Sequence, residues 1–523
     1  MSDEGRRLGE LIGVLESRGH LRNVVSGTHQ GPAALRVTRV DRDSRAVAPG
    51  SLFVAVPGAN ADGHDYAAAA CASGAVAVVV EHAVPGLAVP QVVVRASRPA
   101  MATAAAWVVG FPSLDLGVVG ITGTDGKTTT SFLVRAMLEA CGLPAGIVGT
   151  VTVLAGGKPV RDWAHATTPE APELQRDLAA MRDAGDRFAV VEATSHGLAQ
   201  DRVGDVAWDV GVITNLTHEH LEFHRTHEAY RAAKRRLFEA LAVSPANPAK
   251  GRPKTGVVNA DDRWADEFEG ATRAAGARLL RYGGAPDADV RLTRLGQDAR
   301  SLRMGVATAR WGGDVTLQLA GRFNAHNALA AIAVGEALEL DPARVRAGLE
   351  AMRGVPGRME RIASDLPFSV IVDFAHSPHA LEVVLDDLAP VAAVAGGGIV
   401  AVFGSAGERD VVKRRVMGRI AGERCRLVVV TDEDPRGEDR EAILEEIAAG
   451  AEEAGRRRGH DLLVVADRAD AIGTALEAAR PGDVVVLAGK GHERTIEMAD
   501  GPRPWDERAV AEAAIVALGG RLA

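Results

Sequence analysis

The sequence predicts an α/β protein with three domains: an N-terminal α/β domain over residues 1–112, a central domain with a mostly parallel sheet over residues 113–355, and a C-terminal, Rossmann-like, doubly wound domain over residues 356–523. Two observations lead to this prediction. The chain has 523 residues, which is enough for three ordinary domains. Short apolar runs alternate with stretches rich in Ala, Leu, Glu and Arg, as expected of strands that alternate with helices.

The apolar runs place the strands in order along the chain. In the first domain they lie at residues 51–56, 75–80 and 90–94, and a run at residues 117–122 opens the second domain. The third domain holds five strand-plus-loop units, each followed by a helical pattern, at residues 368–376, 397–405, 426–434, 461–468 and 482–493. Ligands of doubly wound sheets bind at the carboxyl ends of the strands, so the loops after these runs are candidate binding loops.

Composition excludes several function classes. Hydrophobic residues make up 47% of the chain and charged residues 25%, which is ordinary for a soluble globular protein. A net charge of -9 argues against general nucleic-acid binding. The charged N-terminus does not look like a signal peptide, and no apolar run approaches the roughly 20 residues that span a bilayer. Cys71, Cys141 and Cys425 are far apart, which fits a reducing compartment. We therefore expect a cytoplasmic monomer that is not inserted in a membrane.

Residues 117–138 read as a strand, a glycine turn and a helix, which is the arrangement of a phosphate-binding loop. Lys127 would reach the outer phosphates of a nucleotide, and the Thr128 hydroxyl would ligate Mg²⁺. Isoleucine stands at position 121, where the common pattern has glycine, so this is a variant loop built on Gly123 and Gly126. Lysine occurs at only seven positions in the chain, which favours a functional Lys127 over a plain Gly/Thr-rich turn.

The loop "GTDGKTTT" resembles the "GTNGKTTT" loop of the Mur ligases, the ATP-dependent amide-forming enzymes of peptidoglycan synthesis. Other stretches resemble motifs of the MurE type, in the same order: residues 43–66, 167–174, 192–203, 215–238, 321–331, 357–362, 372–381 and 489–493. The number, spacing and order of these motifs make the resemblance strong.

The resemblance implies an activity and its partners. A MurE-type ligase adds the third amino acid, a diamino acid, to UDP-N-acetylmuramoyl-L-alanyl-D-glutamate through an acyl phosphate. The three domains would then bind the UDP-sugar, ATP and the amino acid. The implied cofactors are ATP, two Mg²⁺ ions and a carbamate that CO₂ forms on Lys234.

The resemblance also assigns roles to residues. The catalytic residues would be Lys127, Glu192, His220, Lys234 and Arg358. The metal ligands would be Thr128, Glu192, His220 and carbamylated Lys234. ATP would contact Gly123, Thr124, Asp125, Gly126, Lys127, Thr128, Thr129, Asn324, Asn327, Arg358, Asp373 and His376. The UDP-linked substrate would contact Ser44, Asn60, Ala61, Thr167, Thr168, Thr194, Gln200 and Arg202.

Each role has a plainer alternative. Glu192 can be a strand-end acid in solvent, a single histidine is often structural, and Lys234 can be a solvated helix lysine. Asn324 and Asn327 can also cap a helix. Three departures from the family pattern bear on activity. Asp125 replaces asparagine and would repel a triphosphate unless Mg²⁺, Lys127 or a nearby arginine compensates, or it could help to bind a metal. Glu219 replaces aspartate, and Phe374 replaces tyrosine.

The amino acid would be read by Arg409, Glu433, Asp434, Pro435, Arg436, Gly489 and Glu493. Family members that use meso-diaminopimelate usually have D-N-P-R where this chain has Glu433–Arg436, and lysine users usually lack the arginine. Arg409 would bind the α-carboxylate, and Arg436 could bind a second carboxylate bidentately. Asp434 would repel that carboxylate or pair with Arg436, whereas it would suit the ammonium of lysine or ornithine. These residues are therefore compatible with meso-diaminopimelate and with lysine or ornithine, and they do not decide between them.

Two other functions compete with this prediction. A degenerate family member could serve as a nucleotide-binding partner subunit, which the departures permit but intact Lys127, Glu192, His220 and Lys234 oppose. A ligase resembling folylpolyglutamate synthetases would leave the N-terminal block unexplained.

Overall fold

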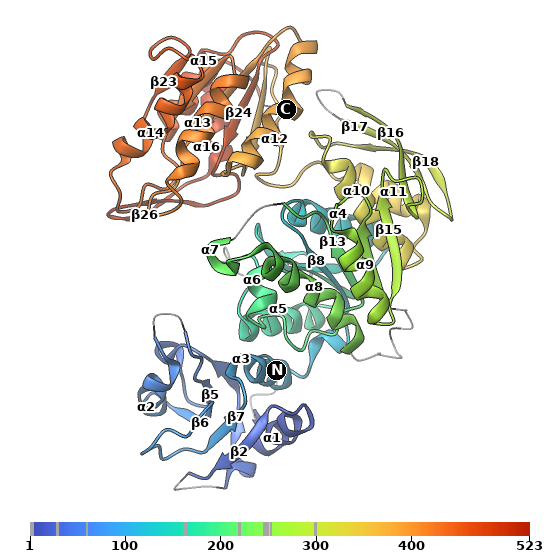
Figure 1. Cartoon of the computed structure of the whole chain (residues 1–523), viewed down its shortest axis with the longest axis vertical. Helices are drawn as coiled ribbons and strands as arrows, with labels where there is room; N and C mark the ends of the chain where they lie inside the picture. The colour runs from blue at the N-terminus through green and yellow to red at the C-terminus, as the bar shows by residue number, and fades with distance from the viewer. Residues whose placement is uncertain are drawn as a thin grey trace. The chain divides into compact units, whose positions relative to one another are not determined.

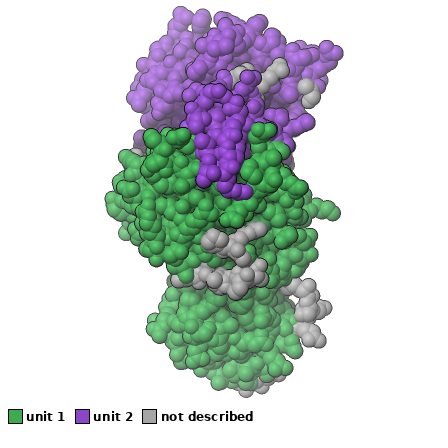
Figure 2. Space-filling view, turned by 90° about the vertical axis from the view of Figure 1, so that its right-hand side faces the viewer, with its two compact units in different colours: residues 1–291, 329–348 green, residues 292–328, 349–523 purple. Residues whose placement is uncertain are grey.

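The computed structural model describes residues 5–27, 31–58, 61–160, 166–217, 221–243, 250, 254–297 and 301–522. The chain packs into two compact units, the first formed by residues 1–291 and 329–348 and the second by residues 292–328 and 349–523 (Figure 2). The predicted domain boundaries at 112/113 and 355/356 stay predictions.

The first unit begins with a five-stranded sheet in the order β2-β7-β6-β5-β4 (Figure 1). Its strands are β2 (Leu21–Val25), β4 (Arg39–Asp41), β5 (Ser51–Val54), β6 (Ala75–Val80) and β7 (Gln91–Val94). Strands β4 to β7 pair in parallel and β2 pairs antiparallel with β7. The helices here are α1 (Leu8–Ser17), α2 (Ala67–Ala72) and α3 (Ser97–Val108), and β1 (Arg6–Arg7) pairs with β3 (Arg36–Val37). The three strands predicted here are confirmed as β5, β6 and β7.

The first unit also holds part of a second sheet of 11 strands, and this part runs β11-β10-β9-β12-β8-β13-β14-β15. Its strands are β8 (Gly117–Thr122), β9 (Ala145–Val148), β10 (Val153–Ala155), β11 (Lys158–Pro159), β12 (Phe188–Glu192), β13 (Val210–Ile213), β14 (Thr255–Asn259) and β15 (Arg278–Gly283). The helices are α4 (Lys127–Ala140), α5 (Ala171–Asp183), α6 (Ser195–Ala199), α7 (Leu221–His224), α8 (His227–Val243) and α9 (Ala265–Ala274). Strands β9, β12, β8, β13, β14 and β15 are parallel, so the carboxyl ends of β12, β8 and β13 meet at one edge.

Several elements lie at the places where the chain passes between the units. Strand β16 (Val290–Gln297) pairs with β15 through Val290 and Arg291. In the second unit, β17 (Leu302–Ala307) and β18 (Gly312–Leu317) form an antiparallel pair. Helices α10 (Asn324–Ala337) and α11 (Pro342–Ala351) each have residues in both units.

The rest of the second unit is a six-stranded sheet in the order β19-β20-β24-β21-β22-β23 (Figure 1). Its strands are β19 (Glu360–Ile362), β20 (Ser369–Asp373), β21 (Ile399–Phe403), β22 (Leu427–Val430), β23 (Leu462–Val464) and β24 (Val484–Ala488). The helices are α12 (Pro378–Val394), α13 (Val412–Arg424), α14 (Arg440–Glu453), α15 (Arg468–Glu477) and α16 (Glu507–Ala517). A hairpin of β25 (Thr495–Met498) and β26 (Gly501–Pro504) follows β24, so four of the five predicted units lead directly into a helix and the fifth does not.

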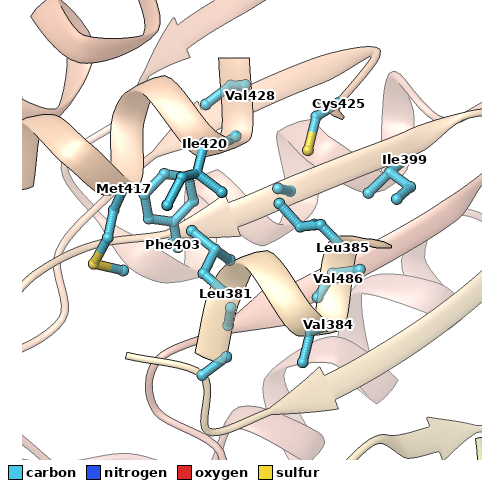
Figure 3. Close-up of a cluster of buried hydrophobic side chains, with 14 of the residues drawn as sticks. Leu381, Val384, Leu385, Ile399, Phe403, Met417, Ile420, Cys425, Val428 and Val486 are labelled. Atoms are coloured by element: carbon cyan, nitrogen blue, oxygen red, sulfur yellow. The ribbon is translucent and has the colours of Figure 1, made fainter. Parts of the chain in front are cut away.

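Both faces of this sheet are covered by helices. Side chains of β21 alternate: Ala401 and Phe403 pack with residues of α12, α13 and α14, whereas Val400 and Val402 pack with residues of α15 and α16. Figure 3 shows the first of these cores, with Phe403 among the aliphatic side chains. This is the doubly wound arrangement that the sequence predicts, and the predicted α/β class is confirmed. Within the described ranges, the structure contains no helix with the length and apolar character needed to cross a membrane.

Candidate active site

The loop between β8 and α4 is built on two glycines with positive φ, Gly123 at 143° and Gly126 at 81°. A side chain at Gly123 is excluded, because its Cβ would lie 1.8 Å from the Thr214 Oγ1. Thr130 is the residue whose N–H bonds back to the Gly126 carbonyl, at 2.9 Å. The N–H groups before it, in the first turn of α4, have no acceptor within the helix and carry its positive end, so they suit a phosphate.

The Asp125 side chain is exposed, and the backbone of Asp125 holds the loop in place through hydrogen bonds. Its N–H donates to the Asn215 Oδ1 at 2.9 Å, and its carbonyl accepts from the Thr214 Oγ1 at 2.6 Å. Both partners follow β13. Among these contacts none uses the Asp125 carboxylate, so an asparagine could occupy the position without changing the loop.

Two hydroxyls, from Thr128 in the first turn of α4 and from Thr150 after β9, lie beside the carboxylate of Glu192. The Thr128 hydroxyl donates to the Glu192 Oε2 at 2.9 Å, and the Thr150 hydroxyl donates to the same oxygen at 3.0 Å. Glu192 ends β12 and is fully buried. The Glu192 Oε1 accepts from the Thr150 N–H at 3.1 Å, and Gly149 makes room for it, because a Cβ there would lie 2.1 Å away. This is not a strand-end acid in solvent. Clustered hydroxyl and carboxylate oxygens are the donors that Mg²⁺ prefers, so the residues fit that ion.

Lys234 of α8 lies beneath the loop and is not a solvated helix lysine. Its side chain is 1% exposed, and its Nζ donates to the Gly123 carbonyl at 2.7 Å. The Nζ lies 4.5 Å from the centre of the Tyr230 ring, and the Tyr230 hydroxyl bonds to the Thr124 Oγ1 at 2.9 Å. Lys127 donates to the same Gly123 carbonyl at 2.9 Å. The two lysines thus meet at one backbone oxygen of the loop.

Three positions of interest lie outside the described residues. Asn60 and His220 have predicted roles, and Glu219 departs from the family pattern. Their roles stay predictions. Ser44 begins a short turn of 3₁₀-helix at Ser44–Ala46, and the Ala61 carbonyl accepts from the Gly58 N–H at 2.9 Å. Both belong to loops of the first sheet.

Five of the eight residues predicted to contact the UDP-linked substrate form one network with Glu192: Thr167, Thr168, Thr194, Gln200 and Arg202. The Thr168 hydroxyl donates to the Glu192 carbonyl at 2.7 Å and lies 3.0 Å from the Thr194 Oγ1. Thr194 also caps α6 by accepting from the Gly197 N–H at 3.1 Å. Thr167 joins through its hydroxyl, 2.9 Å from that of Thr150.

Arg202 completes this network. Its guanidinium donates to the Thr168 carbonyl at 3.0 Å and to the Gln200 Oε1 at 2.9 Å. Burial lowers the pKa of Arg202. The sequence reasoning missed its ion-pair partner Glu170, 3.2 Å away, although Glu170 stands inside the motif at residues 167–174.

The predicted nucleotide residues of the second unit form a separate group. Asp373 is buried and accepts from the Met359 and Ala375 N–H groups at 2.7 and 2.8 Å. Burial raises the pKa of Asp373. The guanidinium of Arg358 lies 4.5 Å from the centre of the Phe374 ring, and the His376 Nδ1 lies 2.9 Å from the Phe374 carbonyl.

Asn324 and Asn327 contact each other at the start of α10. The Asn327 Nδ2 donates to the Asn324 Oδ1 at 2.8 Å, and the Asn324 Nδ2 donates to the Ala320 carbonyl at 2.6 Å. The predicted contact of Asn324 and Asn327 with adenine stays a prediction. The same holds for the prediction that these residues and the phosphate-binding loop of the first unit bind one ATP molecule.

The residues predicted to bind the amino acid lie in three loops: Arg409 after β21, Glu433–Arg436 after β22, and Gly489 and Glu493 after β24. Asp434 does not pair with Arg436. Its Oδ1 accepts from the Lys490 Nζ at 2.7 Å and from the Glu497 N–H at 2.9 Å. Lys490 also donates to the Glu493 Oε2 at 2.6 Å, and burial raises the pKa of Glu493.

The positive charge of Arg436 is not balanced by a carboxylate of the described residues, so it is available to bind a ligand. Its guanidinium makes no ion pair with any carboxylate in the part of the chain that the structure describes. Its backbone has φ 55°, a strained conformation for a non-glycine residue that costs about 1–3 kcal/mol. The Arg436 N–H, bonded to the Glu497 carbonyl at 2.8 Å, holds this conformation.

Glu433 is a buried carboxylate beside Gly489. It is 6% exposed, and its Oε2 has no hydrogen-bond partner among the described residues. A Cβ at Gly489 would lie 3.5 Å from that oxygen. Arg409, predicted to bind the α-carboxylate, is exposed. A buried acceptor in the same loop as the unpaired Arg436 guanidinium suits a ligand that carries both ammonium and carboxylate groups.

The sequence reasoning missed two cations that shape these loops. Lys490 was detectable, because it is one of seven lysines and stands in the motif at residues 489–493. Arg468 gave no sequence signal. It is fully buried, pairs with Glu507, and donates to the Asp432 carbonyl at 2.9 Å and the Ala488 carbonyl at 2.8 Å. It therefore ties together the residues that precede Glu433 and Gly489.

Comparison with protein-family models gives three matches in order along the chain. The model described as Mur ligase family, catalytic domain, matches residues 36–114, the Mur ligase middle domain matches residues 121–335, and the Mur ligase glutamate ligase domain matches residues 357–491.

Curated relatives and a solved structure resemble the chain over most of its length. A UDP-N-acetylmuramyl-tripeptide synthetase of a Roseiflexus species is 47% identical, covering 95% of this chain and 98% of the relative. A UDP-N-acetylmuramoyl-L-alanyl-D-glutamate--2,6-diaminopimelate ligase of Geobacter metallireducens is 42% identical, covering 88% and 91%. A solved structure with that same activity in its name is 28% identical, with a TM-score of 0.68, covering 98% of this chain and 99% of its own.

Proposed function

Because this chain belongs to the Mur ligase family and is an ATP-dependent amide-forming ligase of peptidoglycan synthesis, we propose that it joins meso-diaminopimelate to UDP-N-acetylmuramoyl-L-alanyl-D-glutamate. The family match at residues 36–114 supports this over a ligase resembling folylpolyglutamate synthetases, which would leave that block unexplained. Since the reaction consumes ATP, a cytoplasmic location is part of the same proposal.

The reaction has two steps. The γ-carboxylate of the D-glutamate residue attacks the γ-phosphate of ATP, and the bond to ADP breaks, which leaves an acyl phosphate. An amino group of the incoming amino acid then attacks the acyl carbon, phosphate leaves, and the amine loses a proton. Both steps bring negative groups together, so the protein must supply positive charge around them.

The phosphate loop supplies part of this charge. The first-turn N–H groups of α4 and the Lys127 ammonium would contact the phosphates. Lys127 now donates to the Gly123 and Thr124 carbonyls at 2.9 and 2.6 Å, so it must exchange these contacts for phosphate oxygens.

Thr128 and Glu192 would hold Mg²⁺, which neutralises phosphate charge when bound. A second ion belongs to the proposal together with a carbamate on Lys234. What supports the carbamate is the burial of Lys234 and its place next to the loop, 2.7 Å from the Gly123 carbonyl. A carbamate would turn this cation into an anion able to ligate Mg²⁺.

The observation that carries the choice of amino acid is the pairing of Asp434 with Lys490. Because Asp434 is paired with Lys490, it forms no ion pair with Arg436, and the nearby ammonium weakens its repulsion of a carboxylate. Arg436 can then bind the second carboxylate of diaminopimelate bidentately, while the buried Glu433 accepts from an ammonium group. Lysine and ornithine lack the second carboxylate and would leave Arg436 without a partner.

Substitution of Arg436 tests this choice. In Arg436→Gln the kcat/KM for meso-diaminopimelate should fall by about 10- to 100-fold, because one charge-assisted pair is lost, and the kcat/KM for L-lysine should not fall. Arg503→Gln, which removes an exposed arginine of the β25–β26 hairpin, serves as the matched control. An equal fall for both amino acids would show that Arg436 does not read the side chain.

A further inference from the structure

Lys490 is held between two carboxylates in the second unit. Its side chain is 1% exposed, and its Nζ lies 2.7 Å from the Asp434 Oδ1 and 2.6 Å from the Glu493 Oε2. An ammonium this deeply buried is stable only when it is paired, so these contacts define its surroundings.

The sheet order explains how Lys490 reaches Asp434. Lys490 follows β24 and Asp434 follows β22, and β21 lies between these two strands. Two strand spacings separate the loops by roughly 9.5 Å. The long lysine side chain spans the end of β21, and the Glu497 N–H holds the same Asp434 oxygen at 2.9 Å.

The charges around this contact determine what the pocket can bind. Asp434 stands two residues before Arg436, and a free carboxylate there would pair with the guanidinium or repel an anionic ligand. We propose that Lys490 is a positioning residue for specificity: by binding Asp434 it keeps that carboxylate away from Arg436 and so keeps the pocket selective for an amino acid with a second carboxylate. This inference rests on the proposed function.

A lysine suits this role better than the arginine that the chain uses elsewhere. The ammonium is compact and donates in three directions, so it fits between two carboxylates in a closed space. A guanidinium is planar and larger, and the 1% exposure of Lys490 leaves no open side toward which it could extend.

A double-mutant cycle tests the inference. In Lys490→Met the kcat/KM for meso-diaminopimelate should fall by about 30-fold or more, because Asp434 is left unpaired beside Arg436. The ratio of L-lysine use to diaminopimelate use should rise by about tenfold or more. Asp434→Asn combined with Lys490→Met should restore most of the diaminopimelate activity, because the charge that Lys490 balanced is then absent.

The controls separate specificity from stability. Lys158→Met changes a lysine on the exposed edge strand β11. It should leave unchanged the kcat/KM for meso-diaminopimelate, the ratio of L-lysine use to diaminopimelate use, and the KM for ATP. If Lys490 is only structural, Lys490→Met will lower the use of every amino acid equally and the second substitution will not rescue it. That outcome overturns the inference. If the wild-type enzyme itself prefers L-lysine, the proposed substrate is wrong. The effects of Lys490→Met and Asp434→Asn on kcat/KM should still be non-additive, because the two side chains contact each other.

Discussion

At the residue scale, three lysines of the candidate site have one property in common. Lys127, Lys234 and Lys490 each place a compact ammonium against two or more oxygens, or against an oxygen and an aromatic ring. The chain carries 60 basic residues, and arginine fills most of these positions. At these three positions a compact ammonium suits the close surroundings better than a planar guanidinium, and an amine, unlike a guanidinium, can form a carbamate.

Lys234 is the residue whose chemistry is most specific. We expect Lys234→Ala to lose almost all ligation, because no carbamate can form, and a small carboxylic acid such as formate to restore part of it by supplying the missing anionic oxygens. Lys234→Arg, which keeps the charge but cannot form the carbamate, should be equally inactive. The measurement is the rate of ADP release that depends on the UDP-linked dipeptide. Full activity in either variant would contradict the carbamate.

At the element scale, the active-site residues lie where neighbouring parallel strands end. Because β8 lies between β12 and β13 in the sheet, Thr128 contacts Glu192 at the end of β12, and the loop after β8 contacts Thr214 after β13. The turn at Gly149, after β9, fits around the Glu192 carboxylate.

Gly149→Ala tests this packing. Its Cβ would lie 2.1 Å from the Glu192 Oε1, so the carboxylate must move away from Thr128. We expect ligation to fall by at least about tenfold, a higher Mg²⁺ requirement, and a loss of stability of about 1–3 kcal/mol. Thermal unfolding and a Mg²⁺ titration measure these effects.

Gly270→Ala is the matched control, because nothing lies within 4 Å of its Cβ position in α9. It should stabilise the helix by about 0.5–1 kcal/mol and leave activity unchanged. A normal Mg²⁺ dependence in Gly149→Ala would mean that the position of Glu192 does not matter.

The sequence predicts strands better than it predicts contacts between loops. The apolar runs mark β5, β6, β7, β8 and the five strands β20 to β24, because a buried parallel strand must be apolar on both faces. The hairpin β25–β26 has no comparable run and was not predicted. The contact of Lys490 with Asp434 joins residues 56 positions apart and depends on the order of β24, β21 and β22, which a single sequence does not reveal.

The motifs predicted part of the candidate site. They identified Thr128, Glu192 and Lys234, and the structure brings the first two into contact and places the third under the loop. They left open whether Asp434 forms an ion pair with Arg436, because the answer depends on a third residue, Lys490. Arg468 could not be found, since a buried cation that bonds only to a carboxylate and to backbone carbonyls has no sequence signature.

At the scale of the whole molecule, the second unit has its own buried core, and Cys425 lies inside it (Figure 3). Burial raises the pKa of this thiol to about 12, whereas Cys71 and Cys141 are half-buried. A thiol reagent at neutral pH should therefore label Cys71 and Cys141 in the native protein and Cys425 only after the second unit unfolds. Mass spectrometry of the labelled peptides along a denaturant series measures this order. Rapid labelling of Cys425 without denaturant would contradict the described core.

The most direct test of the account is a ligation assay with UDP-N-acetylmuramoyl-L-alanyl-D-glutamate, ATP, Mg²⁺ and a panel of amino acids. The account predicts that ADP is released only when the UDP-linked dipeptide and an amino acid are both present, and that meso-diaminopimelate is preferred over L-lysine and L-ornithine. The product should have the mass of the UDP-linked tripeptide. Release of ADP without the dipeptide, or no tripeptide with any amino acid of the panel, would contradict the account.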